Sequence, residues 1–434
     1  MHDKLNYIGD YAFYKCDELS TIEFSDNVTN IGEYCFCDCR LLENIKLPRF
    51  LETLKIGALQ NTNICEITIP GSVTEIGSGC FLNCNHLKTV EFEDSDLDLT
   101  LGYGQYNRQP LFIGNPIQRL YLGRNLKEKT MTSNIGYSIS PFMDQTELTN
   151  VTIGNNVKII GPCLFSGCSS LSEINTPNSL EQIGNGAFEG CTNLPIFDNI
   201  QYAGKCAVRV VDKNLDSYNI ANDTKFILSA CFSGCVNLKK IDLPNSIIYW
   251  GDYVFEGCTK LKEITIPDKV ETIAKKMFSG CEELENISIP SNIKIINSDA
   301  FTECDSLEQI IFPATLNLLG QECCSYMPGL KRIYCMASEP PVCEESTLNP
   351  GNSPFGKYNS DFYLRTPNDI PIYVPIGAAE KYRNAWGWDY FTNFIETDDF
   401  PTAIHNVTTE HYDSKNCVYD LMGRRVINPQ KGQV

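Results

Sequence analysis

The 434-residue sequence is poor in histidine, tryptophan and basic residues, and it contains no long apolar run. Lys and Arg number 35 against 54 Asp and Glu, which gives a formal net charge of −19 at pH 7. Binding to phosphate backbones or to anionic lipid needs clustered Lys and Arg, so this balance argues against nucleic acid and against adhesion to membranes. No stretch of about 18 apolar residues occurs, so we expect no transmembrane segment.

The N-terminal residues, MHDKLNYIGDYAF, also lack the apolar core of a signal peptide. Two explanations stay open at this point. Either the protein is cytosolic, or a leader has been removed from it.

Recognisable catalytic patterns are missing as well. The four histidines are His2, His86, His405 and His411, and none lies beside a Ser or Cys in a nucleophile setting. Phosphate loops, nucleophile elbows and zincin patterns are absent. Acidic residues such as Glu263 occupy variable positions that a solvated face explains, although a pair of carboxylates brought together by folding stays open. We expect no enzyme, no catalytic residue and no cofactor.

What the sequence does contain is a repeat. The steps from Ile273 to Ile296 and from Ile296 to Leu319 are both 23 residues long. The unit reads I-G-x-x-A-F-x-x-C-x-x-L-x-x-I-x-I-P-x-x-V-x-x. A missed period of this kind would misassign the whole fold. Aliphatic or Trp residues begin the units at Ile8, Ile31, Leu54, Ile76, Ile160, Ile183, Ile227, Trp250, Ile273, Ile296 and Leu319.

Each unit predicts one strand and one turn. The segment L-x-x-I-x-I-P alternates apolar residues and ends in a strand-terminating Pro, so it should join a parallel ladder. The I-G-x-x-A-F segment turns the chain, and its Phe fills the interior. A single unit cannot bury its apolar face, but stacked units can. We therefore expect an α/β repeat solenoid, a right-handed leucine-rich-repeat horseshoe or curved rod with parallel strands and a C-terminal cap.

The residues that recur at fixed positions of the unit resemble those of the BspA-like leucine-rich repeat family, whose 23-residue repeats are also called treponemal type. The resemblance covers residues 5–335 through its Phe, Cys, Leu and Pro columns. It implies a solenoid on the surface of a bacterium or secreted from it, and several family members are implicated in adhesion to host matrix proteins or other cells. A second likeness, of the VYDLMGRRV segment to the C-terminal tails of secreted Bacteroidetes proteins, points to the same source.

Three domains are expected along the chain. Residues 1–335 form the solenoid, with insertions near 97–105 and 202–214, and the preserved register predicts a continuous stack. Residues 336–396 form an irregular linker and a cap that resembles the family terminus, with a strand at Ile372–Pro375 and a short helix at Ala378–Trp386. Residues 397–434 are the fragment of a tail resembling a sorting segment. We expect a processed or engineered fragment of a surface protein.

The sequence contains 21 cysteines, and nine of them stand at the same position of successive repeats, which we call the main Cys column. In two other copies Thr62 and Met327 occupy this position. We therefore interpret the thiols as core residues rather than as disulfides. A zinc site at Cys35, Cys37 and Cys39 and a redox pair at Cys323 and Cys324 are weaker alternatives, and no metal site is expected. The main column comprises Cys16, Cys39, Cys84, Cys168, Cys191, Cys235, Cys258, Cys281 and Cys304.

Candidate binding residues lie at the outward strand positions and in the cap. Tyr121, Ile311, Arg332 and Tyr334 stand out from small and polar neighbours, and the last three should cluster. Packing of that cluster against the C-terminal segment is the competing explanation. Two cap residues, Trp386 and Trp388, offer a stacking platform for carbohydrate.

The sequence thus favours a non-catalytic, adhesin-like binding protein at the cell surface or outside the cell. It would engage host matrix proteins or other cell surfaces through the solenoid face. Alternatives are a carbohydrate-binding or enzyme-accessory surface protein that uses the cap aromatics, and a structural spacer.

Overall fold

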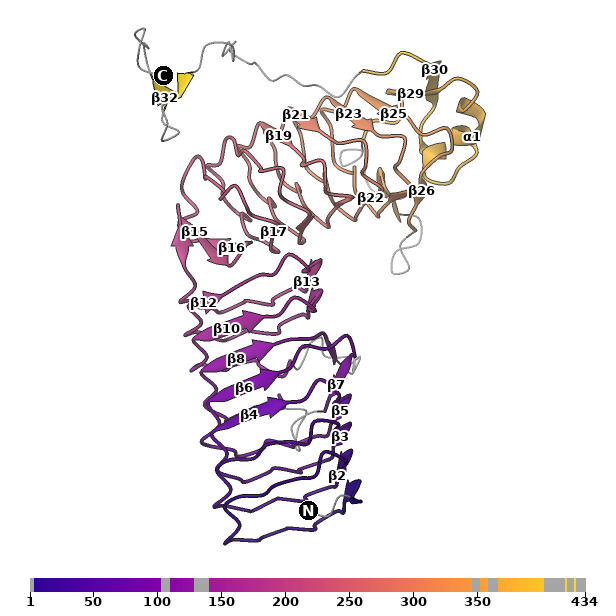
Figure 1. Ribbon diagram of the computed structural model, residues 1–434. Coiled ribbons are helices and arrows are strands. Elements are labelled where there is room, and N and C mark those ends of the chain that lie inside the picture. Colours follow the sequence, from indigo (N-terminus) through magenta and orange to yellow (C-terminus); the bar gives the residue numbers. More distant parts are fainter. Residues whose placement is uncertain are drawn as a thin grey trace.

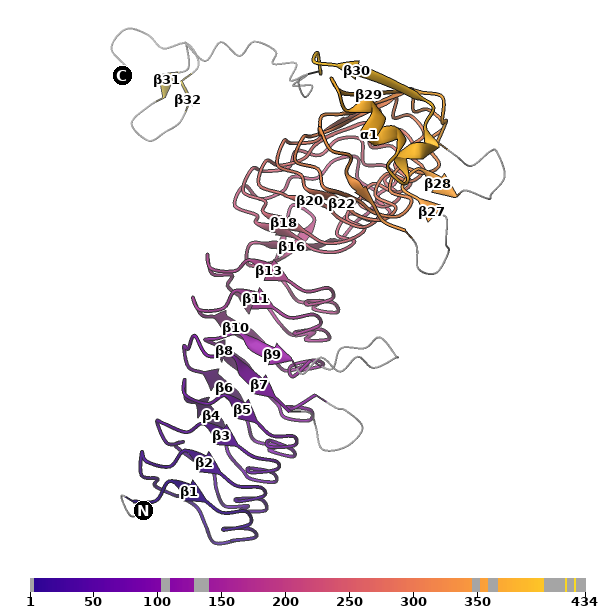
Figure 2. The ribbon, with the colours of Figure 1, turned by 90° about the vertical axis from the view of Figure 1, so that its right-hand side faces the viewer.

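The repeats form a parallel-strand β-solenoid of about 15 turns with almost no helix. The computed structural model describes residues 4–102, 110–128, 140–345, 352–357 and 366–401, together with strand residues 418–419 and 425–426. Successive turns stack along a long axis, with the N-terminal turn at one end and the C-terminal segment beyond the last turns (Figures 1 and 2).

Two parallel ladders run along the N-terminal turns. The predicted strand gives a ladder in the order β12-β10-β8-β6-β4, and the start of the unit gives the shorter strands of a second ladder. The first ladder contains β4 (Glu66–Ile69), β6 (Thr89–Phe92), β8 (Arg119–Leu122), β10 (Asn150–Ile153) and β12 (Glu173–Ile174). The second contains β1 (Tyr7–Ile8), β2 (Asn30–Ile31), β3 (Thr53–Leu54), β5 (Glu75–Ile76), β7 (Leu99–Leu101) and β9 (Leu126–Glu128), followed by the pair β11 (Ile159–Ile160) and β13 (Gln182–Ile183).

Strand register keeps identical repeat positions in line. Val90 of β6 pairs with Leu120 of β8, and both side chains are buried, whereas the neighbouring Glu91 faces outward. Period-2 alternation therefore puts one row of each strand into a shared core and leaves the other row on the surface.

The α/β label is not confirmed. Among the described residues the only α-helix is the five-residue α1 (Ala379–Arg383), and the side of each repeat opposite the first ladder carries turns and strands of two or three residues. The turn of each unit cannot form a helix because positive φ angles recur in it four residues apart, as at Tyr253 (φ 63°) and Gly257 (φ 69°).

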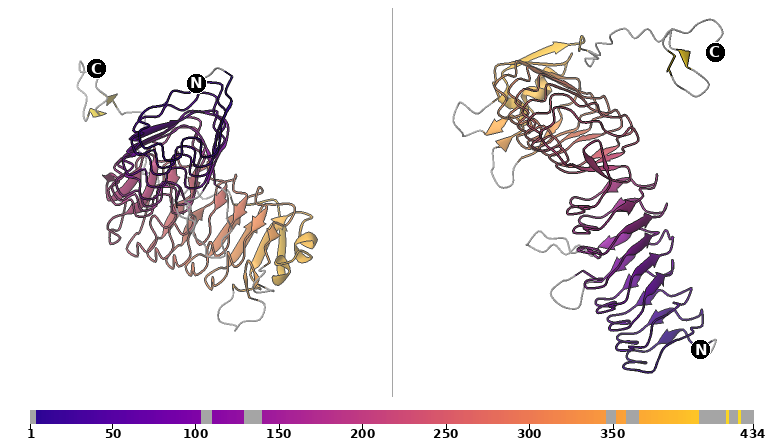
Figure 3. Two further views of the ribbon diagram at one scale, coloured as in Figure 1. Left: turned by 90° about the horizontal axis from the view of Figure 1, so that it is seen from below. Right: turned by 90° about the vertical axis from the view of Figure 1, so that its left-hand side faces the viewer.

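A β-hairpin interrupts the stack of turns, whereas the preserved sequence register predicted a continuous stack. It is formed by β15 (Ile200–Ala203) and β16 (Cys206–Val210), and it lies between β14 (Ile196–Phe197) and the parallel strands β17 (Phe226–Ile227) and β18 (Tyr249–Trp250). Both faces of the hairpin are buried, because alternate side chains pack into two separate hydrophobic cores. The stack changes direction at this hairpin (Figures 1 and 3).

Beyond the hairpin the two-ladder arrangement resumes and extends past the last repeat. Strands β29 and β30 continue the ladder of β23 and β25 in parallel, although they follow the end of the repeat at Cys335. One side contains β19 (Glu263–Thr265), β21 (Asn286–Ser288), β23 (Gln309–Phe312), β25 (Arg332–Cys335), β29 (Pro371–Pro375) and β30 (Asn393–Thr397). The other contains β20 (Thr272–Ile273), β22 (Ile295–Ile296), β24 (Leu318–Leu319) and β26 (Val342–Cys343).

The C-terminal segment packs against the end of the solenoid. Tyr382 of α1 and Trp388 of the 3-10 helix η2 (Trp388–Tyr390) belong to the same core as Phe312 and Ile333. Two hairpins complete the described elements, β27 (Asn352–Ser353) with β28 (Gly356–Lys357), and β31 (Val418–Tyr419) with β32 (Arg425–Val426). Most of the expected tail lies outside the described residues.

Candidate binding surface

An apolar row crosses the outward face of the sheet β23-β25-β29-β30. Strand register brings Ile311, Tyr334, Tyr373 and Ile395 side by side, one from each strand. The rings of Tyr334 and Tyr373 stack with centroids 4.6 Å apart and planes at 15°. We call these four residues the apolar row.

The apolar row follows directly from strand alternation. Its inward neighbours Ile310, Ile333, Ile372 and Phe394 are buried, so the residues one position further along each strand must face out. All four row residues are half-buried or more exposed, and Ile395 is 38% exposed. Large apolar side chains at the surface in such a continuous row are typical of interaction sites.

Arg332 lies in the next outward row, between Gln309 on one side and Pro371 on the other. Arg332 is half-buried, and in the described part of the chain it forms no ion pair. A positive charge therefore borders the apolar row on the same face.

The predicted cluster of Ile311, Arg332 and Tyr334 is thus brought together. The described part of the C-terminal segment adds two strands to the edge of this cluster, which extends the face with Tyr373 and Ile395. The sequence predicted a strand at Ile372–Pro375 but did not single out Tyr373 as a binding residue. Ile395 had no such signal, because β30 lacks the closing Pro of the repeat.

Tyr121 lies far from this face along the stack, on β8. Its hydroxyl donates a hydrogen bond to Asp94 Oδ1 at 2.8 Å. Partial burial, the hydrogen bond and the Asp94 charge together raise the pKa of Tyr121. Its register partners are the polar residues Glu91 and Thr152, so Tyr121 stands alone rather than in an apolar row.

The two tryptophans of the expected cap lie in different environments. Trp388 is fully buried, its Nε1 donates to the Pro341 carbonyl at 3.0 Å, and its ring packs edge-on against Tyr382 at 4.9 Å. A ring enclosed in this way cannot stack on a ligand, so Trp388 does not form part of a carbohydrate platform. Trp386 remains 37% exposed.

The cysteine columns are mostly buried and form no disulfide among the described residues. Column thiols also act as donors, which the sequence did not reveal. Cys281 Sγ donates to the Phe255 carbonyl of the preceding turn at 3.2 Å, and the same contact recurs from Cys168 to Phe142 at 3.2 Å and from Cys191 to Phe165 at 3.1 Å. Burial raises the pKa of Cys168 and Cys191 to about 12, so both thiols stay protonated near neutrality.

Cys35, Cys37 and Cys39 are not arranged as a metal site, and Cys323 and Cys324 lie side by side as thiols. Cys35 and Cys39 point into the core, and the neighbouring Cys37 contacts Asp38 instead, with Sγ 3.8 Å from Oδ2. Cys323 Sγ lies 3.8 Å from Cys324 Sγ, which is hydrogen-bond contact rather than a bond between sulfurs. Across the described ranges no group of three or more His, Cys, Asp or Glu side chains is arranged to hold a metal ion. No helix in the same ranges has the length and apolar character needed to cross a membrane.

The stacked turns and their parallel ladders place the protein in the class of repeat solenoids. The family model for the BspA type leucine rich repeat region matches residues 1–100, 136–207 and 211–331, in 6 copies. These matches cover more than half of the chain, and the chain belongs to this family.

Solved structures with similar chains come from several bacteria. A leucine rich cell surface protein from Faecalibacterium prausnitzii A2-165 is 23% identical, with 76% of this chain and 83% of that chain covered and a TM-score of 0.33. A leucine-rich repeat protein from Bacteroides ovatus ATCC 8483 is 21% identical, with coverage of 90% and 87% and a TM-score of 0.32. The pneumococcal vaccine antigen PcpA is 17% identical, with coverage of 88% and 80% and a TM-score of 0.38. A search of curated proteins found no match.

Proposed function

We propose that this protein is a non-catalytic binding protein that acts at the bacterial surface or outside the cell, and that it engages another protein through the apolar row. Host matrix proteins and the surfaces of other cells are the partners expected from the family. The observation that carries the proposal is the stacked pair Tyr334 and Tyr373, held between Ile311 and Ile395 on a regular sheet.

Preorganisation supports binding at this face. Tyrosines held in a stack on adjacent strands have little side-chain freedom left to lose when a partner covers them. Tyr and Arg are also the residue types that most often anchor interfaces, and Arg332 borders the row. By contrast, Thr68 and Glu91 on the outward face of the N-terminal ladder are polar, and Tyr121 on the same face lies between polar register partners rather than in an apolar row.

The C-terminal segment would serve this face in two ways. As a cap it shields the last apolar turn, because Trp388 and Tyr382 fill the end of the core beside Phe312. Through β29 and β30 it also supplies half of the apolar row. We therefore assign residues 366–397 to the cap and residues 4–335 to the solenoid.

The test is binding to a panel of purified extracellular matrix proteins, measured beside a glycan array. The double variant Tyr334→Ala/Tyr373→Ala should lose protein binding by about tenfold or more while keeping its fold, because both rings face outward. The matched control Thr68→Ala/Glu91→Ala changes another outward pair on adjacent strands and should bind normally. Equal binding by the two double variants would contradict the proposed face.

The carbohydrate alternative rests on Trp386, the one cap tryptophan with an exposed ring among the described residues. If the protein binds glycans only, and Trp386→Ala abolishes that signal, the alternative replaces the proposal. A single aromatic without its expected partner Trp388 is a weaker platform than two.

A further inference from the structure

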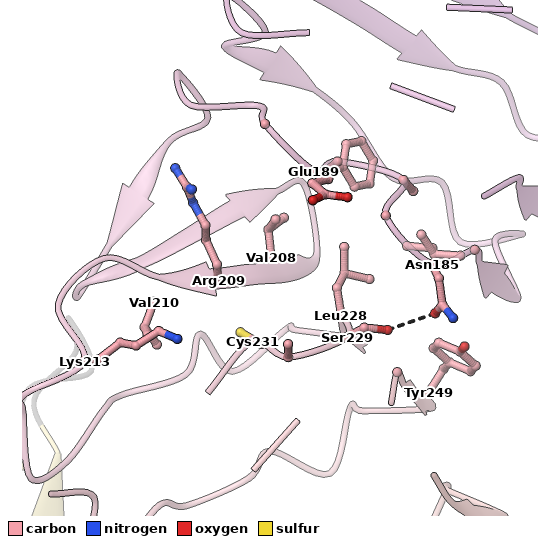
Figure 4. Close-up of a pocket in the computed structure, with 18 residues that line it drawn as sticks. Asn185, Glu189, Val208, Arg209, Val210, Lys213, Leu228, Ser229, Cys231 and Tyr249 are labelled. Carbon is pink, nitrogen blue, oxygen red and sulfur yellow. Dashed lines mark hydrogen bonds between the residues drawn. The ribbon is translucent and has the colours of Figure 1, made fainter. Parts of the chain in front are cut away.

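A cavity of about 500 Å³ lies beside the β15–β16 hairpin, away from the apolar row. The turn at residues 184–190 lines one side of it, and residues 228–231 line the other (Figure 4). Apolar side chains from Phe188, Val208 and Leu228 form part of its wall. The volume falls within the range of about 300–1,000 Å³ that small-molecule and cofactor sites occupy.

Three backbone hydrogen bonds normally join one turn of the solenoid to the next. The amides of Ala230, Phe232 and Gly234 donate to carbonyls of the following turn, at 2.8, 3.0 and 2.7 Å. The acceptors are two residues apart, at positions 252, 254 and 256. Donors at alternate positions thus meet acceptors at alternate positions.

At the cavity this pattern is broken. The equivalent amides are those of Gly186, Phe188 and Gly190, which have no hydrogen-bond acceptor in the described part of the chain. The reason is that the hairpin takes the place of the next turn. The hairpin forms hydrogen bonds to the turn that follows it: Val210 N and Lys213 Nζ donate to the carbonyls of Cys231 and Ser233 at 3.2 and 2.6 Å.

The three amides therefore form a row of donors along the cavity wall. All three residues line the cavity. These N–H groups have no acceptor among the described residues, so they are available to a ligand that brings carbonyl or carboxylate oxygens.

Two cations lie on the hairpin side of the cavity. Arg209 bonds through Nε to Gln201 Oε1 at 2.6 Å, and its remaining guanidinium nitrogens form no ion pair with a described residue. Lys213 lies at the same end, and Glu189 projects from the opposite wall (Figure 4). Two positive groups against one negative group favour an acidic ligand, in a chain whose overall charge is −19.

We propose that this cavity binds a peptide segment of another polypeptide that carries an acidic side chain. Carbonyls of the peptide accept from the amides of Gly186, Phe188 and Gly190, as carbonyls of the following turn do elsewhere in the stack, and its carboxylate pairs with Arg209. The two oxygens of a small carboxylate lie on one carbon and cannot bond to all three amides at once.

Hydrogen exchange on the full chain tests the donor row. In the free protein, residues 184–191 should exchange faster than the matched turn at 251–258, whose amides are paired. Adding the peptide Ac-Thr-Val-Glu-Val-Thr-NH2 should slow exchange in 184–191 and leave 251–258 unchanged. Equal exchange of the two turns in the free protein, or no protection by the peptide, would overturn the proposal.

Calorimetry with the same peptide tests the acidic preference. Arg209→Glu should weaken binding by about tenfold or more, since a charge-assisted hydrogen bond becomes a repulsion. The control Arg40→Glu makes the same charge change at an exposed residue far along the chain and should have no effect.

Reversing the charge of the peptide shows whether the Arg209→Glu variant has lost binding through charge repulsion or through loss of its fold. The peptide with Lys in place of Glu should bind the native protein weakly and the Arg209→Glu variant more tightly. Glutarate serves as the small-carboxylate probe. If glutarate protects residues 184–191 as strongly as the peptide does, or if the Lys peptide shows no recovery, peptide recognition is wrong.

Discussion

The regular turns at residues 228–310 and the hairpin junction at residues 192–227 solve the same stacking problem differently. In the regular turns each Phe ring stacks on the next, with centroids 5.4 Å apart from Phe232 to Phe255 and 5.8 Å from Phe255 to Phe278. At the junction this stack stops, and Tyr218 packs against Phe232 at an interplanar angle of 61°.

The difference teaches what repetition contributes. A repeat unit is complementary to its own copy, so rings, thiols and amides all meet equivalent partners one turn away. A hairpin can fill the space with apolar side chains on both faces, but it cannot reproduce three carbonyls at the right spacing. The cavity and its three unpaired amides are the result.

The largest expected effect comes from ionising column thiols of the regular repeats. The folded-state pKa values of Cys168 and Cys191, about 12, lie above the ordinary value of 9.0. Their contribution to stability is therefore complete below about pH 9 and is lost as pH rises toward 12. We expect about 1.4 kcal/mol of lost unfolding free energy per pH unit for each thiol.

Urea unfolding at pH 7, 9 and 11 measures this loss. The double variant Cys168→Ala/Cys191→Ala should show a shallower dependence above pH 9, whereas Cys65→Ala, which removes an exposed thiol, should not change it. An identical slope in all three proteins would contradict the assignment.

The next effect separates the two regions by their aromatic contacts. Phe255 and Phe226 are both fully buried, but Phe255 stacks on two rings whereas Phe226 contacts only Tyr249, at 6.4 Å, among the described rings. Phe255→Ala should cost about 3–5 kcal/mol of unfolding free energy. Phe226→Ala should cost about 1 kcal/mol less, since aromatic pairs add about 0.5–1.5 kcal/mol beyond burial.

Urea denaturation followed by circular dichroism measures both changes. Phe255→Leu and Phe226→Leu are the matched controls, because they keep an apolar side chain but remove the ring. Equal losses in the two Ala variants would show that ring stacking does not distinguish the regions.

The smallest effect concerns the thiol hydrogen bond. Cys281 in a regular turn and Cys206 at the junction are both fully buried, but only Cys281 donates to a carbonyl, that of Phe255. Cys281→Ala should therefore destabilise the protein more than Cys206→Ala, by about 0.5–1 kcal/mol, the usual strength of a weak hydrogen bond. Equilibrium unfolding of both variants decides the point, and a larger loss for Cys206→Ala would refute it.

Much of the fold could be predicted from the repeat. The Leu-x-x-Ile-x-Ile segment predicted the parallel ladder, and the Phe and Cys columns predicted the core. The second ladder was missed because its strands are only two or three residues long and carry no strand signature of their own. The α/β class is not confirmed, because the turn segment of the repeat contains positive φ at residues such as Tyr253, which is held by a hydrogen bond between turns from Tyr253 N to the Lys275 carbonyl.

The candidate surface was predicted in part. Alternation along each strand placed Ile311 and Tyr334 outward, but it could not place β30 beside β29. For Trp388, composition near the C-terminus suggested an exposed ring, whereas packing against Tyr382 and Phe312 buries it.

The sequence by itself determined the repeat length, the register of the ladders and which side of each strand faces the core, because these depend on spacing along the chain. Only the tertiary structure decided that the C-terminal strands extend the last sheet and that the hairpin leaves three amides unpaired. Both depend on which segments become neighbours across turns, and that choice is made by packing and hydrogen bonding between residues distant in sequence.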